Sequence, residues 1–95
     1  MNVKSLHTHG KPVSMINIFK GTKGIVNAMQ ILEGQQMKKH KAADGALLIC
    51  IDGETTYECE DGTKVVLSNT DYVNIPPKLE HWVSASKDAQ LLLIQ

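Results

Sequence analysis

Short apolar runs, broken at near-regular intervals by turn residues, constrain the fold of this chain most. Turn residues occur at 21–24, at Asp52-Gly53, at Asp61-Gly62 and at 69–71. Asp-Gly is among the strongest two-residue hairpin signals, because both residues accept the positive φ that tight turns need. Short strands separated in this way favour a sandwich or barrel over alternating strands and helices. The sequence therefore predicts an all-β fold with little or no helix.

The expected strands are rich in β-branched and other apolar residues. They span residues 13–19, 25–32, 46–51, 55–60, 64–67, 72–75, 82–85 and 89–94. In this assignment Asp52-Gly53 and Asp61-Gly62 each reverse the chain, so that 55–60 is the return strand of a hairpin. Because no linker or low-complexity stretch interrupts the 95 residues, we expect a single domain over 1–95.

Charge and hydropathy exclude several classes of partner. The formal net charge is zero, so no basic field is available to bind nucleic acid or an anionic membrane. No apolar stretch approaches the ~20 residues of a membrane helix, and the first residues lack the apolar core of a signal peptide. We therefore expect a cytoplasmic protein with reduced Cys50 and Cys59, whose spacing is not that of a CxxC pair. A chain this short buries a limited core, which favours a homodimer that light scattering would detect.

Two histidines stand in frames set by glycine and proline. Gly34 precedes His40 by six positions, and Gly53 ends the segment that follows. Pro76 precedes His81 by five positions. The first frame covers about residues 34–53 and the second about residues 70–85.

These two frames, in this order, resemble the two motifs of the cupin superfamily, and the similarity covers roughly residues 24 to 95. The resemblance implies a double-stranded β-helix, the jelly-roll barrel of RmlC-like cupins. Several motif positions depart from the family pattern. They are Ala42 at the second histidine, Ala46 at the glutamate, Thr70 and Lys78 at the two glycines, and Ala85 at the asparagine.

The departures bear on metal binding. Metal-binding cupins hold Fe, Mn, Zn, Ni or Cu with three imidazoles and one carboxylate, but Ala42 and Ala46 offer no ligand atom. His40 and His81 remain, and two neutral imidazoles bind metal weakly, since sites usually need three or four protein ligands. We therefore expect no firmly bound cofactor. The alternative is a divalent ion such as Fe, Mn, Zn or Ni at His40 and His81.

Alternate residues of a strand share a face, which predicts the lining of the pocket. If His40 points inward, the even-numbered residues that follow do so too, provided that no bulge intervenes. The predicted small-molecule pocket is lined by His40, His81, Ala42, Ala46, Leu48 and Cys50. Trp82 alternates with His81 and is expected to face away from this pocket.

Three functions are compatible with these features. The first is a cupin-like small-molecule-binding barrel that is metal-free or weakly metal-binding. The alternative is a small metal-dependent oxygenase or isomerase that uses His40 and His81 with a third, unrecognised ligand. The third is a scaffold protein in which both histidines are incidental. The sequence names neither a ligand nor a reaction, and the terminal pair His7 and His9 is expected to be exposed to solvent.

Overall fold

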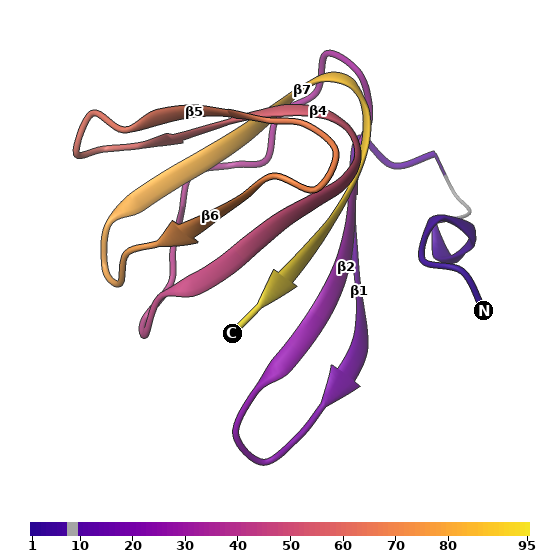
Figure 1. The fold of residues 1–95 in the computed structure, drawn as a ribbon, viewed down its shortest axis with the longest axis horizontal. Helices are drawn as coiled ribbons and strands as arrows, with labels where there is room; N and C mark the ends of the chain where they lie inside the picture. Colours follow the sequence, from indigo (N-terminus) through magenta and orange to yellow (C-terminus); the bar gives the residue numbers. More distant parts are fainter. Residues whose placement is uncertain (8–9) are drawn as a thin grey trace.

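The fold is a curled antiparallel sheet, described by a computed structural model of residues 1–7 and 10–95 (Figure 1). Its elements are η1 (Lys4–Leu6), β1 (Val13–Lys20), β2 (Ile25–Ile31), β3 (His40–Lys41), β4 (Ala46–Cys59), β5 (Lys64–Leu67), β6 (Tyr72–Ile75) and β7 (Glu80–Ile94). The prediction of an all-β fold with little or no helix is confirmed, since η1 is a single short 3-10 turn. Among the described residues, no helix has the length and apolar character needed to cross a membrane.

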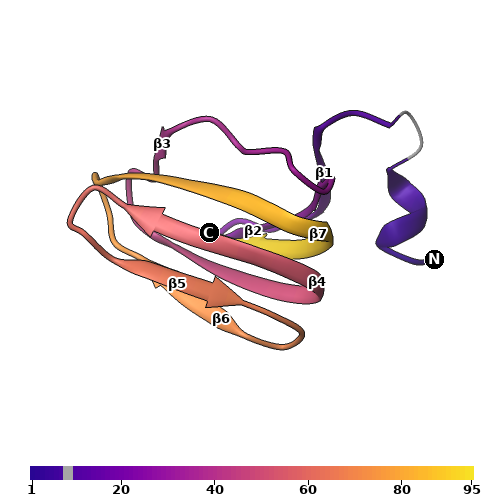
Figure 2. The same cartoon turned by 90° about the horizontal axis from the view of Figure 1, so that it is seen from above.

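Two long strands organise the sheet. The strand order is β1-β2-β7-β4-β5, and β3 also pairs with β7 while β6 also pairs with β4. The first half of β4 pairs with β6 and its second half with β5. The first half of β7 pairs with β3 and its second half with β2. Because β4 and β7 bend together between these partners, the sheet folds back over itself (Figure 2).

The predicted hairpin at Asp52-Gly53 is wrong. Strand β4 runs without interruption through this dipeptide, and 55–60 is not a return strand. On both sides of the dipeptide β4 pairs with β7, with register shifts between Cys50 and Thr55. Gly53 has φ +87° and lies against the backbone of Asp88 and Ala89. Gly53 is therefore part of a β-bulge in β4. A bulge bends a strand without reversing it.

Most other boundaries follow the prediction. The second Asp-Gly pair does form a hairpin, closed by hydrogen bonds from the Gly62 amide to the Cys59 carbonyl and from the Cys59 amide to the Thr63 carbonyl. The expected strands 82–85 and 89–94 are two parts of β7, which bends opposite Gly53. The sequence did not predict η1 or the two-residue strand β3.

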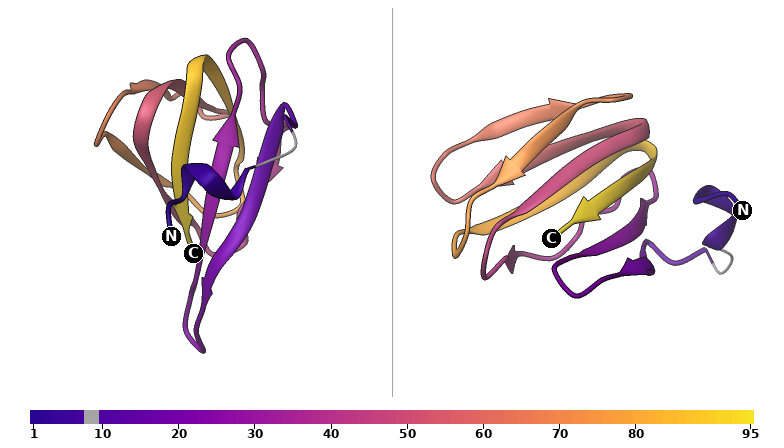
Figure 3. Two further views of the ribbon diagram at one scale, coloured as in Figure 1. Left: turned by 90° about the vertical axis from the view of Figure 1, so that its right-hand side faces the viewer. Right: turned by 60° about the horizontal axis from the view of Figure 1, so that its bottom comes forward.

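The core lies between the two halves of the curled sheet. Its most buried apolar side chains, each at or below 1% exposed, include Ile31, Leu48, Leu67, Val83 and Leu91. In β4 the inward positions are even-numbered before the bulge and odd-numbered after it, so that Leu48 and Tyr57 both face the core. The N-terminal segment lies outside this core, beside β1 (Figure 3).

Candidate functional site

A row of three side chains, two imidazoles and one thiol, crosses the inner face near the start of β7. His81 lies opposite Cys59 of β4 on one side and opposite His40 of β3 on the other. The His40 and His81 rings are 5.8 Å apart between centroids and meet edge to face at 74°. The two histidines that the sequence singled out are therefore neighbours, although they are far apart along the chain.

The buried Tyr57 also contacts His81. Its ring lies 6.0 Å from that of His81 with an interplanar angle of 32°. Tyr57 is 1% exposed and His81 is 3% exposed. Within the described residues, the Tyr57 hydroxyl and the His81 Nδ1 are both buried without a partner in good hydrogen-bond geometry, although the Cys59 side chain is near the hydroxyl and the Leu79 backbone is near the imidazole. Leaving such groups unpaired costs about 1–3 kcal/mol each, so a pair of them marks a place that can bind a complementary polar group.

The surroundings keep both groups neutral. Burial, and then the charge of neighbouring His40, lower the pKa of His81, while the Leu79 carbonyl opposes this shift. Burial, and then the neighbouring Cys59, raise the pKa of Tyr57 well above its usual range. Near pH 7 the tyrosine is therefore a hydroxyl donor, and the histidine offers one donor and one acceptor. The site suits an uncharged polar group better than an ion, because Val65 and Val83 flank Tyr57 on the adjacent strands.

His40 connects this buried pair to the surface. His40 is exposed and lines an open depression of about 350 Å³ together with Ala42, Asp44 and Gly45. Its ring also meets that of His81. Of the three rings, only that of His40 belongs to a residue that lines this depression, and Tyr57 and His81 lie behind it.

The structure separates the other predicted pocket residues into two groups. Ala42 is buried next to His40, and Ala46 packs against the core at the start of β4. Leu48 pairs with Leu93 and Val73, farther along β4. Cys50 lies at the bend, with its thiol directed toward the Asp52 carbonyl oxygen at 3.4 Å. Leu48 and Cys50 are therefore buried core residues, and neither is a register partner of His40 or His81.

Trp82 lies on the opposite face from His81, as predicted. Its indole N–H donates to the Glu58 carboxylate at 2.9 Å. The Lys39 ammonium lies 5.0 Å from the centre of its ring, within reach of a cation–π contact. These contacts brace the outer side of β7 and β4 behind the candidate site.

The donor atoms present do not fit a resident metal ion. Outside residues 8–9, no group of three or more His, Cys, Asp or Glu side chains is placed to hold one ion. His40 and His81 are two ligands where a stable site uses three or four. The neighbouring Ala42 and Ala46 add none.

Tyr57 and Cys59 were missed as site residues at the sequence level. The bulge at Gly53 shifts the alternation, so that odd-numbered residues of β4 face inward after it. A strand that contains an Asp-Gly bulge and resumes with alternating Thr55, Tyr57 and Cys59 carries the signal that could have identified them. The expectation of solvent exposure is wrong for His7, which is partly buried because its ring packs beside β1 next to Ser14. His9 lies outside the described part of the chain.

Acidification tests the environment of His81. Since its folded pKa is below the unfolded value of about 6.5, the unfolded chain binds more protons below that pH. We expect the free energy of unfolding to fall as the pH drops from 7.5 to 5, with a His81 contribution of at most about 1.4 kcal/mol per pH unit. Denaturant titrations should show a smaller pH slope in His81→Asn. An unchanged slope in that variant would contradict the assignment, and His7→Asn measures the contribution of the other histidine whose pKa burial lowers.

Solved structures with the same architecture support the resemblance seen in the motifs. A cupin superfamily protein from Desulfitobacterium hafniense superposes with a TM-score of 0.85 at 13% identity, over 98% of this chain and 84% of that one. A cupin-2 domain protein from Shewanella frigidimarina gives 0.80 at 18% identity, over 100% and 92%. An RmlC-like cupin with a double-stranded β-helix fold from Methanocaldococcus jannaschii gives 0.78 at 17% identity, over 94% and 84%.

The architecture is therefore that of a cupin barrel, a double-stranded β-helix. No family model matches the sequence, and no curated protein matches it. At these identities the structural likeness establishes the fold and leaves the chemistry to be argued from the side chains.

Proposed function

We propose that this barrel binds a small uncharged ligand at Tyr57 and His81, approached past His40, without a resident metal. The observation that carries the proposal is the buried pair of unpartnered polar atoms, the Tyr57 hydroxyl and the His81 Nδ1. A carbonyl or hydroxyl group of a ligand would satisfy both atoms, and the apolar neighbours would cover the rest of the molecule. His40 and Ala42 would form the entrance.

A matched substitution separates ligand binding from a structural role. Tyr57→Phe keeps the ring and removes only the hydroxyl. We expect the free protein to be as stable as the wild type, or more stable by about 1 kcal/mol, because an unpaired buried polar group is lost. Small ketones, amides and alcohols that perturb the His81 ring signals in NMR spectra of the wild type should bind about tenfold more weakly to the variant. A less stable variant with unchanged affinity would refute the proposal.

The metal-dependent alternative requires a third ligand. Its direct test is metal analysis of protein purified without an affinity tag, before and after addition of Fe, Mn, Zn or Ni. We expect the stoichiometry to stay well below one ion per chain, because two imidazoles hold an ion weakly. One retained ion per chain would favour the metal-dependent enzyme. The homodimer and the cytoplasmic location stay predictions.

A further inference from the structure

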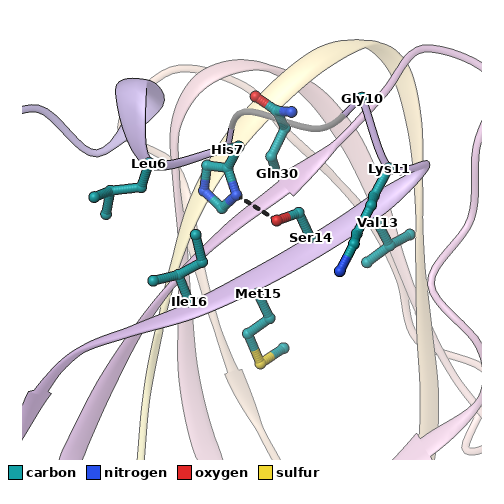
Figure 4. A pocket seen from close by; sticks show the side chains of 9 residues that line it. All are labelled: Leu6, His7, Gly10, Lys11, Val13, Ser14, Met15, Ile16 and Gln30. Atoms are coloured by element: carbon teal, nitrogen blue, oxygen red, sulfur yellow. Dashed lines mark hydrogen bonds between the residues drawn. The ribbon is translucent and has the colours of Figure 1, made fainter.

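A second cavity, of about 150 Å³, lies outside the barrel between the N-terminal segment and β1. Figure 4 shows its polar members, His7, Ser14, Gln30 and Lys11, gathered over one stretch of β1. Ser14 and Gln30 are direct partners across β1 and β2, and Gln30 alternates with the core residues Met29 and Ile31, so both lie on the outer face of the sheet. This cavity is therefore separate from the Tyr57 and His81 site on the inner face.

The amide of Gln30 presents its donor end to ligands. Its Oε1 already accepts a hydrogen bond from Gln90 Nε2 at 2.6 Å. Gln90 is 4% exposed and Gln30 is 9% exposed, so this bond fixes the amide inside the protein. Since its oxygen is engaged, the Gln30 Nε2 hydrogens are the group left to bind a ligand.

His7 and Ser14 form a pair with unused capacity. Nδ1 of His7 lies 2.7 Å from the Ser14 hydroxyl. Nε2, on the side of the ring away from Ser14, is buried and has no hydrogen-bond partner within the described residues (Figure 4). In the tautomer with its hydrogen on Nε2, the ring accepts from Ser14 and keeps a donor. In the other tautomer, Nδ1 donates to Ser14 and the serine hydroxyl can donate to a ligand. In either state the pair offers one hydrogen-bond donor.

The charges around the cavity also favour an anionic ligand. Lys11 lines the cavity with a cationic side chain, and none of the nine described residues that line it is Asp or Glu. Burial alone accounts for the lowered pKa of His7, which agrees with the absence of a carboxylate beside it. Among the described residues, the cavity lining thus combines one cation with several donors and no competing anion.

We propose that this outer cavity binds a small carboxylate anion. A carboxylate has only acceptors, which match the Lys11 ammonium, the Gln30 amide hydrogens and the donor of the His7–Ser14 pair. The apolar walls from Leu6, Val13 and Ile16 suit a short aliphatic group. The volume is below the ~300–1,000 Å³ of pockets for drug-sized ligands, so the ligand is a molecule of a few heavy atoms.

Acetate is the probe for this site. We would titrate the ¹⁵N-labelled full chain with sodium acetate at pH 7.5, against sodium chloride at equal ionic strength. Acetate should cause saturable shifts of the Ser14 amide and the Gln30 side-chain amide, with a dissociation constant on the order of millimolar. Shifts no larger than those caused by chloride would overturn the proposal.

Two lysines of similar chemistry supply the matched control. Lys11 lines the cavity, whereas Lys20 is at the far end of β1. Lys11→Ala should weaken acetate binding about tenfold, because it removes a charge-assisted hydrogen bond, while Lys20→Ala should leave the affinity unchanged. Equal affinities of the two variants would refute the proposal.

Gln30→Glu places a carboxylate inside the cavity. It should abolish acetate binding in a protein whose remaining amide spectrum is intact, and undiminished binding there would overturn the proposal. If this variant does not fold, the comparison of Lys11→Ala with Lys20→Ala still tests whether the cavity binds acetate. Tyr57→Phe should bind acetate as the wild type does, which keeps this result independent of the inner site.

Discussion

Replacing Gly53 with alanine is expected to cost at least about 3 kcal/mol of unfolding free energy, or to prevent folding. Gly53 has φ +87°, where a Cβ is strained. The added methyl would also overlap the Asp88 carbonyl oxygen and lie 2.7 Å from the Ala89 Cα. These are backbone atoms of β7, so no side chain can move aside to make room.

Gly62→Ala is the matched control for that experiment. Gly62 has φ +95° and also follows an aspartate, but, its chain neighbours aside, no described residue would lie within 4 Å of an alanine Cβ at this position. Its replacement should therefore cost only the backbone strain, about 1–2 kcal/mol. Urea titrations of both variants would measure the difference. Equal losses would show that β4 and β7 do not approach closely at the bulge.

These two glycines also show how far local sequence determines this fold. Asp52-Gly53 and Asp61-Gly62 are identical dipeptides between apolar runs, and both were predicted to be hairpins. Only the second is one, because β4 and β5 pair directly across it. At the first, both halves of β4 pair with β7, which lies some thirty residues later in the chain. The positions of most strand segments followed from the sequence pattern, whereas the choice between bulge and turn depended on a distant partner.

The candidate site was predictable to a similar extent. The motif spacing indicated His40 and His81, and the structure pairs them across β3 and β7. Tyr57 was not predicted as a site residue, because the bulge changes which residues of β4 face inward. The outer cavity was also missed. The cavity is lined by residues of the N-terminal segment, β1 and β2, such as His7 and Gln30. A short-range sequence pattern cannot predict that residues so far apart along the chain line one cavity.

Restoring ligands at Ala42 and Ala46 is expected to give the largest gain of function. The cupin resemblance implies an imidazole at the first position and a carboxylate at the second, so Ala42→His with Ala46→Glu would raise the donor count from two to four. Zinc or nickel should then bind on the order of 1,000-fold more tightly than to the wild type, because stable sites use three or four protein ligands. Competition with a chromophoric chelator would measure this gain.

The apo form of the double variant supplies a second readout. Ala46 packs against the core, so a carboxylate there is desolvated and should lower stability until a cation neutralises it. Added metal should then raise the melting temperature in proportion to the logarithm of its concentration. Ala43→His, at an exposed neighbouring position, is the control and should gain little affinity.

If the double variant gains no affinity, the four positions do not converge on one point, and the frame around His40 and His81 resembles a metal site in sequence alone. If it gains affinity as expected, the barrel has kept the geometry of a metal centre while lacking half of its donors. The unpartnered Tyr57 hydroxyl and His81 Nδ1 are then the polar groups that the native chain presents at that place, and they can bind a ligand without an ion.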